Sequence, residues 1–409
     1  MTLDLRMAWR NLWRHKRRTW LTATAMIFSN VLLIFMISLQ LGSYDMMINN
    51  TLQAFSGHLQ VQHDGYNHNP KLRTSIPSVL ALAEQVRQAL PGAGVTARAA
   101  AFALASSELR SVGIQVIGVQ PDHEPRVSTL PGLVQEGRFL QDPDAAEIVI
   151  GGVLARNLKV TTGDELTLLG SGRDGSFAAG VVTVVGIFNS SSVDMDRSLA
   201  EIPLGYFQDT FAMEGHGNSI AISTDNLEQI PAASGRVNNI IAGQDALVLL
   251  DWTALHPGLQ QAIKADFSSA WFMYGVLIIL VAFSVLNTQL MSVLERTREF
   301  GVITALGIKP SRLASLVMLE TALMAAIGLA IGVLLGALVA LYFNAAGFSY
   351  PGMDEMAVRF NLPASIYPSV SVISLLLGPA VVFLFCLLAS IYPALRLFRL
   401  RPVEAMRAV

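Results

Sequence analysis

The sequence has little charge and almost no cysteine. Only 14% of its 409 residues are Asp, Glu, Lys or Arg, whereas 52% are hydrophobic and the mean hydropathy is +0.49. A water-soluble chain carries more charge, so this composition excludes an ordinary soluble protein and predicts a membrane protein with a water-facing part. The lone cysteine, Cys386, excludes a disulfide framework, and we interpret it as a small packing residue.

Motifs for nucleotide, metal and catalytic chemistry are also missing from the sequence. It contains no G-x-x-x-x-G-K-[ST] loop that would hold phosphates, no H-E-x-x-H and no C-x-x-C. The glycine-rich "GSGRDGS" lacks the lysine and is predicted to be a turn. His58, His63 and His68 are spaced by five, which alternates the two faces of a strand and argues against a metal site. We therefore expect no metal, no catalytic residues and no nucleic-acid partner for this chain.

Four apolar segments are each long enough to cross a bilayer, which takes about 20 residues. They predict transmembrane helices at residues 19–43, 267–293, 313–343 and 366–395. Residues 1–18 precede the first helix and have the pattern of a basic amphipathic helix, which suits the inner membrane surface. Alternatively, their basic residues serve only as a topology signal. No A-x-A cleavage pattern follows the first apolar run, so we predict an uncleaved anchor.

Charge predicts the side of the membrane that each segment faces. The net charge is +5 over residues 1–18, +2 over 294–312 and +3 over 396–409, whereas residues 44–266 carry −10. Because Lys and Arg collect in cytoplasmic segments, the first three are expected to be cytoplasmic. The 44–266 insert and the short loop 344–365 are then expected outside the cytoplasm.

The 44–266 insert is long enough to bury a core of its own. Helical spacing continues from the first span through "SYDMMINNTLQAF", and Gly57 is predicted to end that helix. Stretches such as "HLQVQ" and "IQVIGVQ" alternate like strands, while "IPSVLALAEQVRQALPG" predicts a helix. The most strand-rich part, about 130–200, is interpreted as a subdomain. The predicted fold is an α-helical membrane protein with four transmembrane helices and an α+β extracytoplasmic domain inserted between helices 1 and 2.

Two features of the third apolar segment indicate tertiary contacts. Gly328, Gly332 and Gly336 recur every four residues, which places them on one helix face and favours close packing against another helix of this chain or of a second copy. Glu320 is the one acidic residue within the four apolar segments and lies about two turns from the cytoplasmic edge. It either pairs with an arginine of the 294–312 segment or has a substrate or proton role, and we favour the pairing.

The segment between the second and third spans has an unusual order of residues. In "LERTREFGVITALGIKPSRL", charged residues come first, an apolar stretch follows, and a glycine and a proline end it. "ERTREFGVITAL" predicts about three helical turns, Gly307 fits the left-handed position after the helix, and Pro310 prevents continuation. Phe300, Ile303 and Leu306 would form an apolar patch. A short helix of this kind suits docking into a groove of another protein, or it rests on the lipid interface without a partner.

These residues carry a resemblance to a known family. "LERTREFGVITALGIKPSRL" resembles the cytoplasmic coupling segment of the MacB/LolC/FtsX-type ABC transporter permeases, which transmit mechanical motion. "MAWRNLWRHKRRTWLTA" is similar to the family's start and "YPALRLFRLRPVEAMR" to its end. "EIVIGGVLARNLKVTTGDELTLLG" resembles the external domain, closest to the lipoprotein-releasing LolC/LolE branch. The resemblance implies that the coupling segment comprises Glu295, Arg296, Arg298, Glu299, Phe300, Gly301, Ala305, Leu306 and Gly307.

The same resemblance implies partners and an activity. Family members work in the bacterial inner membrane as dimers of permeases, so a second copy or a homologue is expected beside this chain, together with membrane lipids. A separate cytoplasmic ABC ATPase would bind ATP and Mg, since the chain begins only a few residues before its basic helix, unlike MacB with its fused ATPase. The expected activity is release of lipoproteins or lipids to a periplasmic carrier. MacB-like efflux of periplasmic cargo and FtsX-like regulation of a periplasmic enzyme are the alternatives.

Overall fold

The computed structural model describes residues 3–14, 16–190, 192–244, 246–353 and 365–399. The predicted C-terminal tail therefore lies largely outside the described residues, as does the middle of the predicted 344–365 loop. The chain divides into two compact units. One is formed by the two ends of the chain together with Ile263–Tyr350, and the other by Met46–Ala262. We call the first the helical unit and the second the inserted unit.

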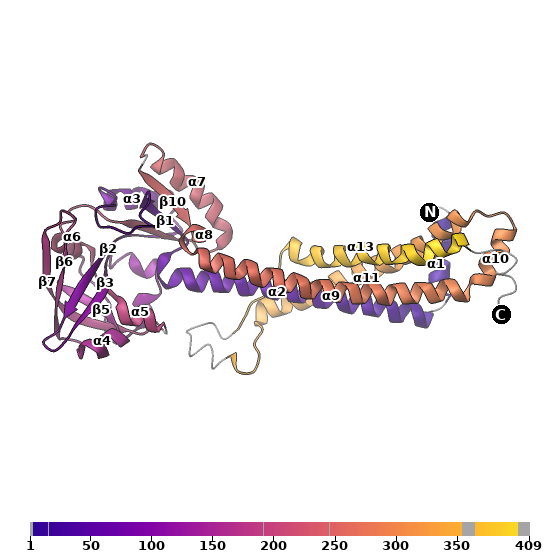
Figure 1. The fold of residues 1–409 in the computed structure, drawn as a ribbon, viewed down its shortest axis with the longest axis horizontal. Helices are drawn as coiled ribbons and strands as arrows, with labels where there is room; N and C mark the ends of the chain where they lie inside the picture. Colours follow the sequence, from indigo (N-terminus) through magenta and orange to yellow (C-terminus); the bar gives the residue numbers. More distant parts are fainter. Residues whose placement is uncertain (1–2, 15, 191, 245, 354–364, 400–409) are drawn as a thin grey trace. The chain divides into compact units, whose positions relative to one another are not determined.

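Four long helices dominate the helical unit (Figure 1). They are long and apolar enough to cross a membrane, at Thr19–Ser56, Pro257–Glu295, Pro310–Ala346 and Val372–Arg399. The corresponding helices and the two short ones that accompany them are α1 (Leu3–Leu12), α2 (Lys16–Thr51), α9 (Pro257–Glu295), α10 (Thr297–Ala305), α11 (Pro310–Ala346) and α13 (Val372–Arg396). The first three helices extend beyond the predicted spans because helical spacing continues into the flanking sequence. The fourth was predicted to start at 366, but it begins at Val372, where the Ser371 side chain caps the helix by accepting from Ser374 N.

Small residues bring α2 and α11 together. A Cβ atom added at Gly328 would lie 2.9 Å from Met26, one at Gly332 would lie 2.6 Å from Asn30, and one at Gly336 would lie 2.7 Å from Ile34. Each step of four along α11 thus matches a step of four along α2. The packing partner is a helix of the same chain, and only glycine leaves room for it, because lipid supplies no hydrophobic drive and association depends on close contact.

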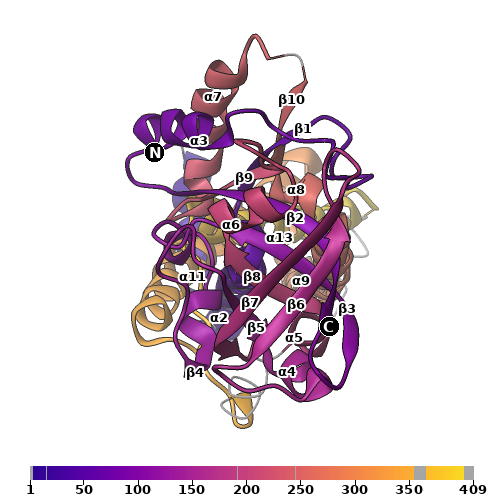
Figure 2. The same ribbon diagram turned by 90° about the vertical axis from the view of Figure 1, so that its left-hand side faces the viewer.

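The inserted unit contains one ten-stranded mixed sheet in the order β10-β1-β9-β2-β3-β8-β5-β7-β4, with β6 pairing β2 and β7. Figure 2 shows β6 and β7 side by side. Most neighbours are antiparallel, while β3–β8 and β5–β7 are parallel. The strands are β1 (Leu59–His63), β2 (Gly94–Ser106), β3 (Ser111–Val119), β4 (Val134–Gly137), β5 (Glu147–Gly151), β6 (Glu165–Ser171), β7 (Phe177–Phe188), β8 (Leu199–Pro203), β9 (Ser219–Ser223) and β10 (Leu247–Asp251).

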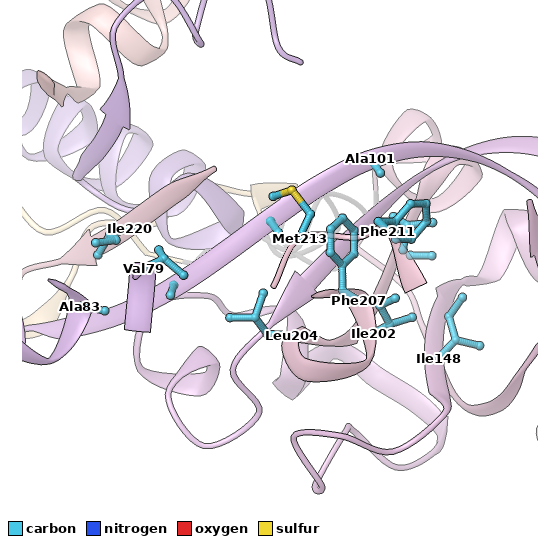
Figure 3. Packing of buried hydrophobic residues seen from close by; sticks show 14 of the residues in the cluster. Val79, Ala83, Ala101, Ile148, Ile202, Leu204, Phe207, Phe211, Met213 and Ile220 are labelled. Atoms are coloured by element: carbon cyan, nitrogen blue, oxygen red, sulfur yellow. The ribbon is translucent and has the colours of Figure 1, made fainter. Parts of the chain in front are cut away.

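Among the described residues of the inserted unit, six α-helices accompany this sheet and help to bury its core. They are α3 (Val79–Ala89), α4 (Gly152–Leu158), α5 (Val193–Ser198), α6 (Leu204–Thr210), α7 (Ile230–Ile241) and α8 (Trp252–Leu255). Phe207 of α6 packs with Phe211 and Met213 against strand residues (Figure 3). The strand-rich stretch 130–200 supplies β4 to β8, which join β2 and β3 in the one sheet instead of forming a separate one.

Candidate coupling site at α10

The chain breaks its helix between α9 and α10. Helix α9 ends at Glu295, Arg296 leaves helical geometry with φ −97° and ψ 6°, and α10 begins at Thr297. The single helix predicted to start at Glu295 is therefore wrong in its first turn. The break directs the Arg296 side chain inward, where only 9% of the residue is exposed.

The end of α10 follows the predicted chemistry. Gly307 has φ +90°, and its N–H donates to the carbonyl oxygen of Thr304 over 3.0 Å, while Ile308 N–H donates to Ile303 over 3.4 Å. This pair of bonds is a Schellman motif, which satisfies the last carbonyls of the helix and requires a left-handed residue. Pro310 then starts α11. The non-helical Arg296 before α10 and the Schellman motif at Gly307 after it thus limit this helix to nine residues.

Glu320 forms the centre of a buried polar cluster. Its carboxylate accepts hydrogen bonds from Arg296 Nη1 at 3.1 and 3.2 Å and from Asn11 Nδ2 at 2.7 Å. Glu320 is 6% exposed, so its charge is screened little by water and needs a partner. The structure places that partner on the 294–312 segment, as in the pairing favoured from the sequence.

A second ion pair ties α10 to the segment after α1. Arg14 Nη2 lies 2.8 Å from Glu299 Oε1, and Arg14 Nη1 donates to Glu299 Oε2 over 3.1 Å. Arg296 Nε lies 3.5 Å from Glu299 Oε2 and so joins the two pairs. Burial opposes ionisation of Glu299, but hydrogen bonding and charge from Arg14, together with Arg296, outweigh it and lower the pKa of this carboxyl. The carboxylate is therefore ionised at neutral pH.

The space beside this cluster is small and polar. Arg296 and Glu320 line a cavity of about 20 Å³, and Thr288, Gln289 and Ser292 of α9 contribute to the same lining. That volume holds about one water molecule. A substrate does not fit there, so the arrangement supports a structural and electrostatic role for Glu320.

The predicted coupling residues divide into inward-facing and outward-facing sets. Phe300 is 1% exposed and packs against Leu313, Val317 and Leu397, so its predicted place in a docking patch is wrong. Residues of α11 and of the end of α13 cover the face of α10 that carries Phe300, and the sequence alone did not predict this contact. Gly301 is also buried, while Ala305 and Gly307 are exposed and Ile303 is half-buried.

A different surface is available on α10. Leu306 is 79% exposed and Val302 is 45% exposed, and Arg298 lies on the same stripe of the helix, at intervals of four residues. Ile308 follows, also exposed. We call the group Arg298, Val302, Leu306 and Ile308 the α10 patch. It presents apolar groups beside a cation, next to a helix end that the buried cluster holds in place.

Sequence reasoning missed Asn11 and Arg14 as members of the site. They lie 309 and 285 positions from their partners, and nothing in their local sequence marks the contact. Their only sequence signal was membership of a basic amphipathic segment. Among the residues that the structure describes, no group of His, Cys, Asp and Glu side chains could hold a metal ion.

These features define a class of protein, a multi-pass membrane permease with a large α/β domain inserted between its first two spans. Residues 19–240 match the family described as MacB-like periplasmic core domain, and residues 271–402 match the FtsX-like permease C-terminal family. Because the first match covers more than half of the chain, the chain belongs to that family. It is an ABC transporter permease of the LolC/MacB/FtsX type.

Known relatives span most of the chain at modest identity. A lipoprotein-releasing system transmembrane protein LolC from Xylella fastidiosa is 25% identical over 311 residues, covering 71% of this chain and 72% of the relative. A macrolide export ATP-binding/permease protein MacB from Sodalis glossinidius is 24% identical over 427 residues, covering 98% of this chain and 60% of the relative. The solved periplasmic region of MacB from Actinobacillus actinomycetemcomitans is 13% identical with a TM-score of 0.37, covering 53% of this chain and 95% of that structure.

Proposed function

We propose that this permease transmits ATP-driven motion from a separate cytoplasmic ABC ATPase to its inserted unit, and that α10 is the contact with the ATPase. The α10 patch carries this proposal. It joins exposed Leu306 and Val302 to Arg298, and the Glu299 and Arg296 side chains behind it connect α10 to α1 and α11. A push on α10 would therefore reach the long helices through charge-assisted bonds, of which the Arg296–Glu320 pair is buried, instead of being absorbed by a flexible loop.

In this proposal a separate polypeptide supplies the energy. The 409 residues contain no phosphate-binding loop, and the described cavity beside α10 is too small for a nucleotide. ATP and Mg would bind to the ATPase partner, and a second copy of this chain or a homologue would complete the permease pair. The segments of net positive charge, including the one with α10, would face the cytoplasm, and the inserted unit would face the periplasm of a bacterial inner membrane.

For the cargo, we propose lipoproteins or lipids released from the inner membrane towards a periplasmic carrier. The relatives named LolC support this choice, since they match about 70% of the chain. MacB-like efflux of periplasmic cargo is the second candidate, and the match to a MacB over 98% of the chain favours it.

The contact with the ATPase can be tested by co-purification. We expect the full chain, purified in mild detergent, to retain an ABC ATPase and to show ATP turnover only with it. Leu306→Asp and Arg298→Glu should weaken both, because they place an opposing charge on the α10 patch. Arg10→Glu is the matched control, since it reverses an exposed charge on α1 outside the patch. Unchanged ATPase retention in both patch variants would contradict the assignment.

The cargo can be tested with the same complex in proteoliposomes. A triacylated, fluorescently labelled lipoprotein should leave the membrane upon ATP addition when a soluble carrier is present, and its deacylated form should show no ATP-dependent effect. ATP-dependent movement of a soluble macrolide with no lipoprotein release would instead support the efflux candidate.

A further inference from the structure

The outer end of α2 has an unusual form. After Thr51 the helix widens into a π-helical turn over Leu52–Ser56, and Gly57, with φ +71°, ends it. The Gly57 N–H donates to Leu52 O over 2.8 Å, five residues back. A helix has no internal donors for its last four carbonyl groups, which here belong to residues 53–56.

Each of these four carbonyls accepts a hydrogen bond from another part of the inserted unit, to which residues 53–56 also belong. Gln53 O accepts from Thr129 N at 2.7 Å, and Ala54 O from Ser128 Oγ at 2.9 Å. The remaining two contacts are Arg98 Nη1 to Phe55 O and Gln60 Nε2 to Ser56 O, the latter at 2.7 Å. Helix ends are ordinarily completed by water or local caps, whereas this one is completed by side chains and backbone from β1, β2 and the segment after Glu124–Arg126.

Arg98 is the one charged donor among the four. Its guanidinium lies 4.4 Å over the Phe55 ring, so one residue of the helix is held by its ring as well as its carbonyl. Glu124 orients it through Arg98 Nε to Oε2 at 3.2 Å and through Nη2 to Oε1, and Thr96 Oγ1 also donates to Oε2 at 3.2 Å. Arg98 and Glu124 are 3% and 0% exposed. Charge-assisted bonds in such a setting fix both direction and distance.

The same end also contacts the entry to α9. Ser56 Oγ lies 2.9 Å from His256 Nε2, and His256 is the residue immediately before α9. About two turns earlier, Asn49 Oδ1 lies 2.9 Å from Nε2 of His58, and Nδ1 of His58 accepts from Thr224 N at 3.0 Å. Several segments of the inserted unit therefore contact this helix end, which lies within the same unit.

We propose that the four carbonyls of residues 53–56 and their donors form a rigid joint, with Arg98 as its positioning residue, which fixes this helix end to the sheet of the inserted unit so that a displacement of the helix end is passed to the sheet. The proposal rests on the proposed function for the source of the motion. The rigidity of the joint itself does not depend on it.

The first test measures that rigidity. Spin labels on cysteines introduced at Thr51 and Glu165, both exposed, would report the distance from α2 to β6 in full-length protein, with Cys386 replaced by Ser. The test variant is Arg98→Met with Glu124→Gln, which removes both charges and leaves neither one buried alone. We expect one narrow distance distribution in the parent and a broadened one in the variant. Arg126→Met is the matched control because Arg126 is exposed in the same segment.

A second variant covers the case in which the first fails to fold. Ser128→Ala with Gln60→Leu removes two of the four donors with little change of volume, and it should also broaden the distribution. Equal widths in the parent and in whichever variants fold would overturn the joint.

The second test measures transmission in the reconstituted complex. With the joint variant we expect ATP turnover to persist and ATP-driven lipoprotein release to be lost. Release at the parent's rate from a variant with a broadened distribution would overturn the transmitting role. If the parent itself shows no ATP-driven release, the proposed function fails, while the distance comparison still upholds or overturns the joint.

Discussion

The ion pair between Arg296 and Glu320 allows a quantitative prediction. Both residues are less than 10% exposed, and the carboxylate accepts two bonds from the guanidinium and one from Asn11. Glu320→Gln keeps the shape of the side chain but leaves Arg296 without its main counter-charge. Removing one member of a buried pair costs about 3–5 kcal/mol. Because Glu299 Oε2 remains 3.5 Å from Arg296 Nε, we expect a loss near the lower end, about 3 kcal/mol.

A double-mutant cycle separates the pair from its surroundings. Arg296→Met alone should cost about as much as Glu320→Gln alone, because it strands the buried carboxylate. The two changes together should come within about 1–2 kcal/mol of the parent, since replacing a whole buried pair is often close to neutral. The free energy of unfolding would be measured by denaturant titration of the full chain in micelles, followed by circular dichroism.

The exposed pair Arg138–Glu147 in the inserted unit serves as the control for that cycle. Its side chains are 44% and 19% exposed, and its coupling should be only about 0–1 kcal/mol. Additive effects of Arg296→Met and Glu320→Gln, with no coupling beyond that of the control pair, would refute the account of the cluster.

Three further predictions follow from particular contacts. Gly332→Leu should reduce the folded protein recovered in detergent, because even a Cβ there would lie 2.6 Å from Asn30. Gly275→Ala on α9 should be tolerated, since a Cβ at Gly275 has no neighbouring atom within 4 Å. Burial and then the charge of Glu124 raise the pKa of Glu201 in the folded protein. As the pH rises above about 4.5, Glu201 ionises in the unfolded chain before it ionises in the folded one, so the free energy of unfolding should fall. Glu201→Gln should make the free energy of unfolding less dependent on pH in this range, measured by denaturant titrations at several pH values. Burial lowers the pKa of His58, so the stability that neutral His58 contributes is complete above about pH 6.5 and is lost as the pH falls through its folded-state pKa. His58→Gln should remove this loss of unfolding free energy at acidic pH in the same titrations.

Local sequence signals predicted much of this architecture. Apolar length identified the four long helices, alternation identified strands such as β1 and β3, and Gly307 with Pro310 identified the end of α10. Each of these depends on neighbours in sequence, which backbone geometry and helix or strand periodicity govern directly. The spacing of Gly328, Gly332 and Gly336 likewise predicted a contact face, although it could not name α2 as the partner.

The rest depended on contacts between distant residues. Phe300 has the composition of a surface anchor, and only the positions of α11 and α13 show that it is a core residue. Arg14 and Glu299 have ordinary charged neighbours, and their pairing requires α1 to return to α10. The hydrogen bond from Arg98 to the carbonyl oxygen of Phe55 likewise joins residues 43 positions apart. Such pairings arise from tertiary packing, which a single sequence does not encode in any local pattern.

The matched spacing of α2 and α11 restricts how these helices can move. The contacts pair Gly328 with Met26, Gly332 with Asn30 and Gly336 with Ile34. Because the residue numbers rise together by four, the two helices run in the same direction in constant register. Axial slip by a fraction of a turn would drive each side chain off its glycine and into the neighbouring bulky residues. The next equivalent fit lies four residues away, about 6 Å along the axis. We therefore expect α2 and α11 to tilt together and not to slide past each other.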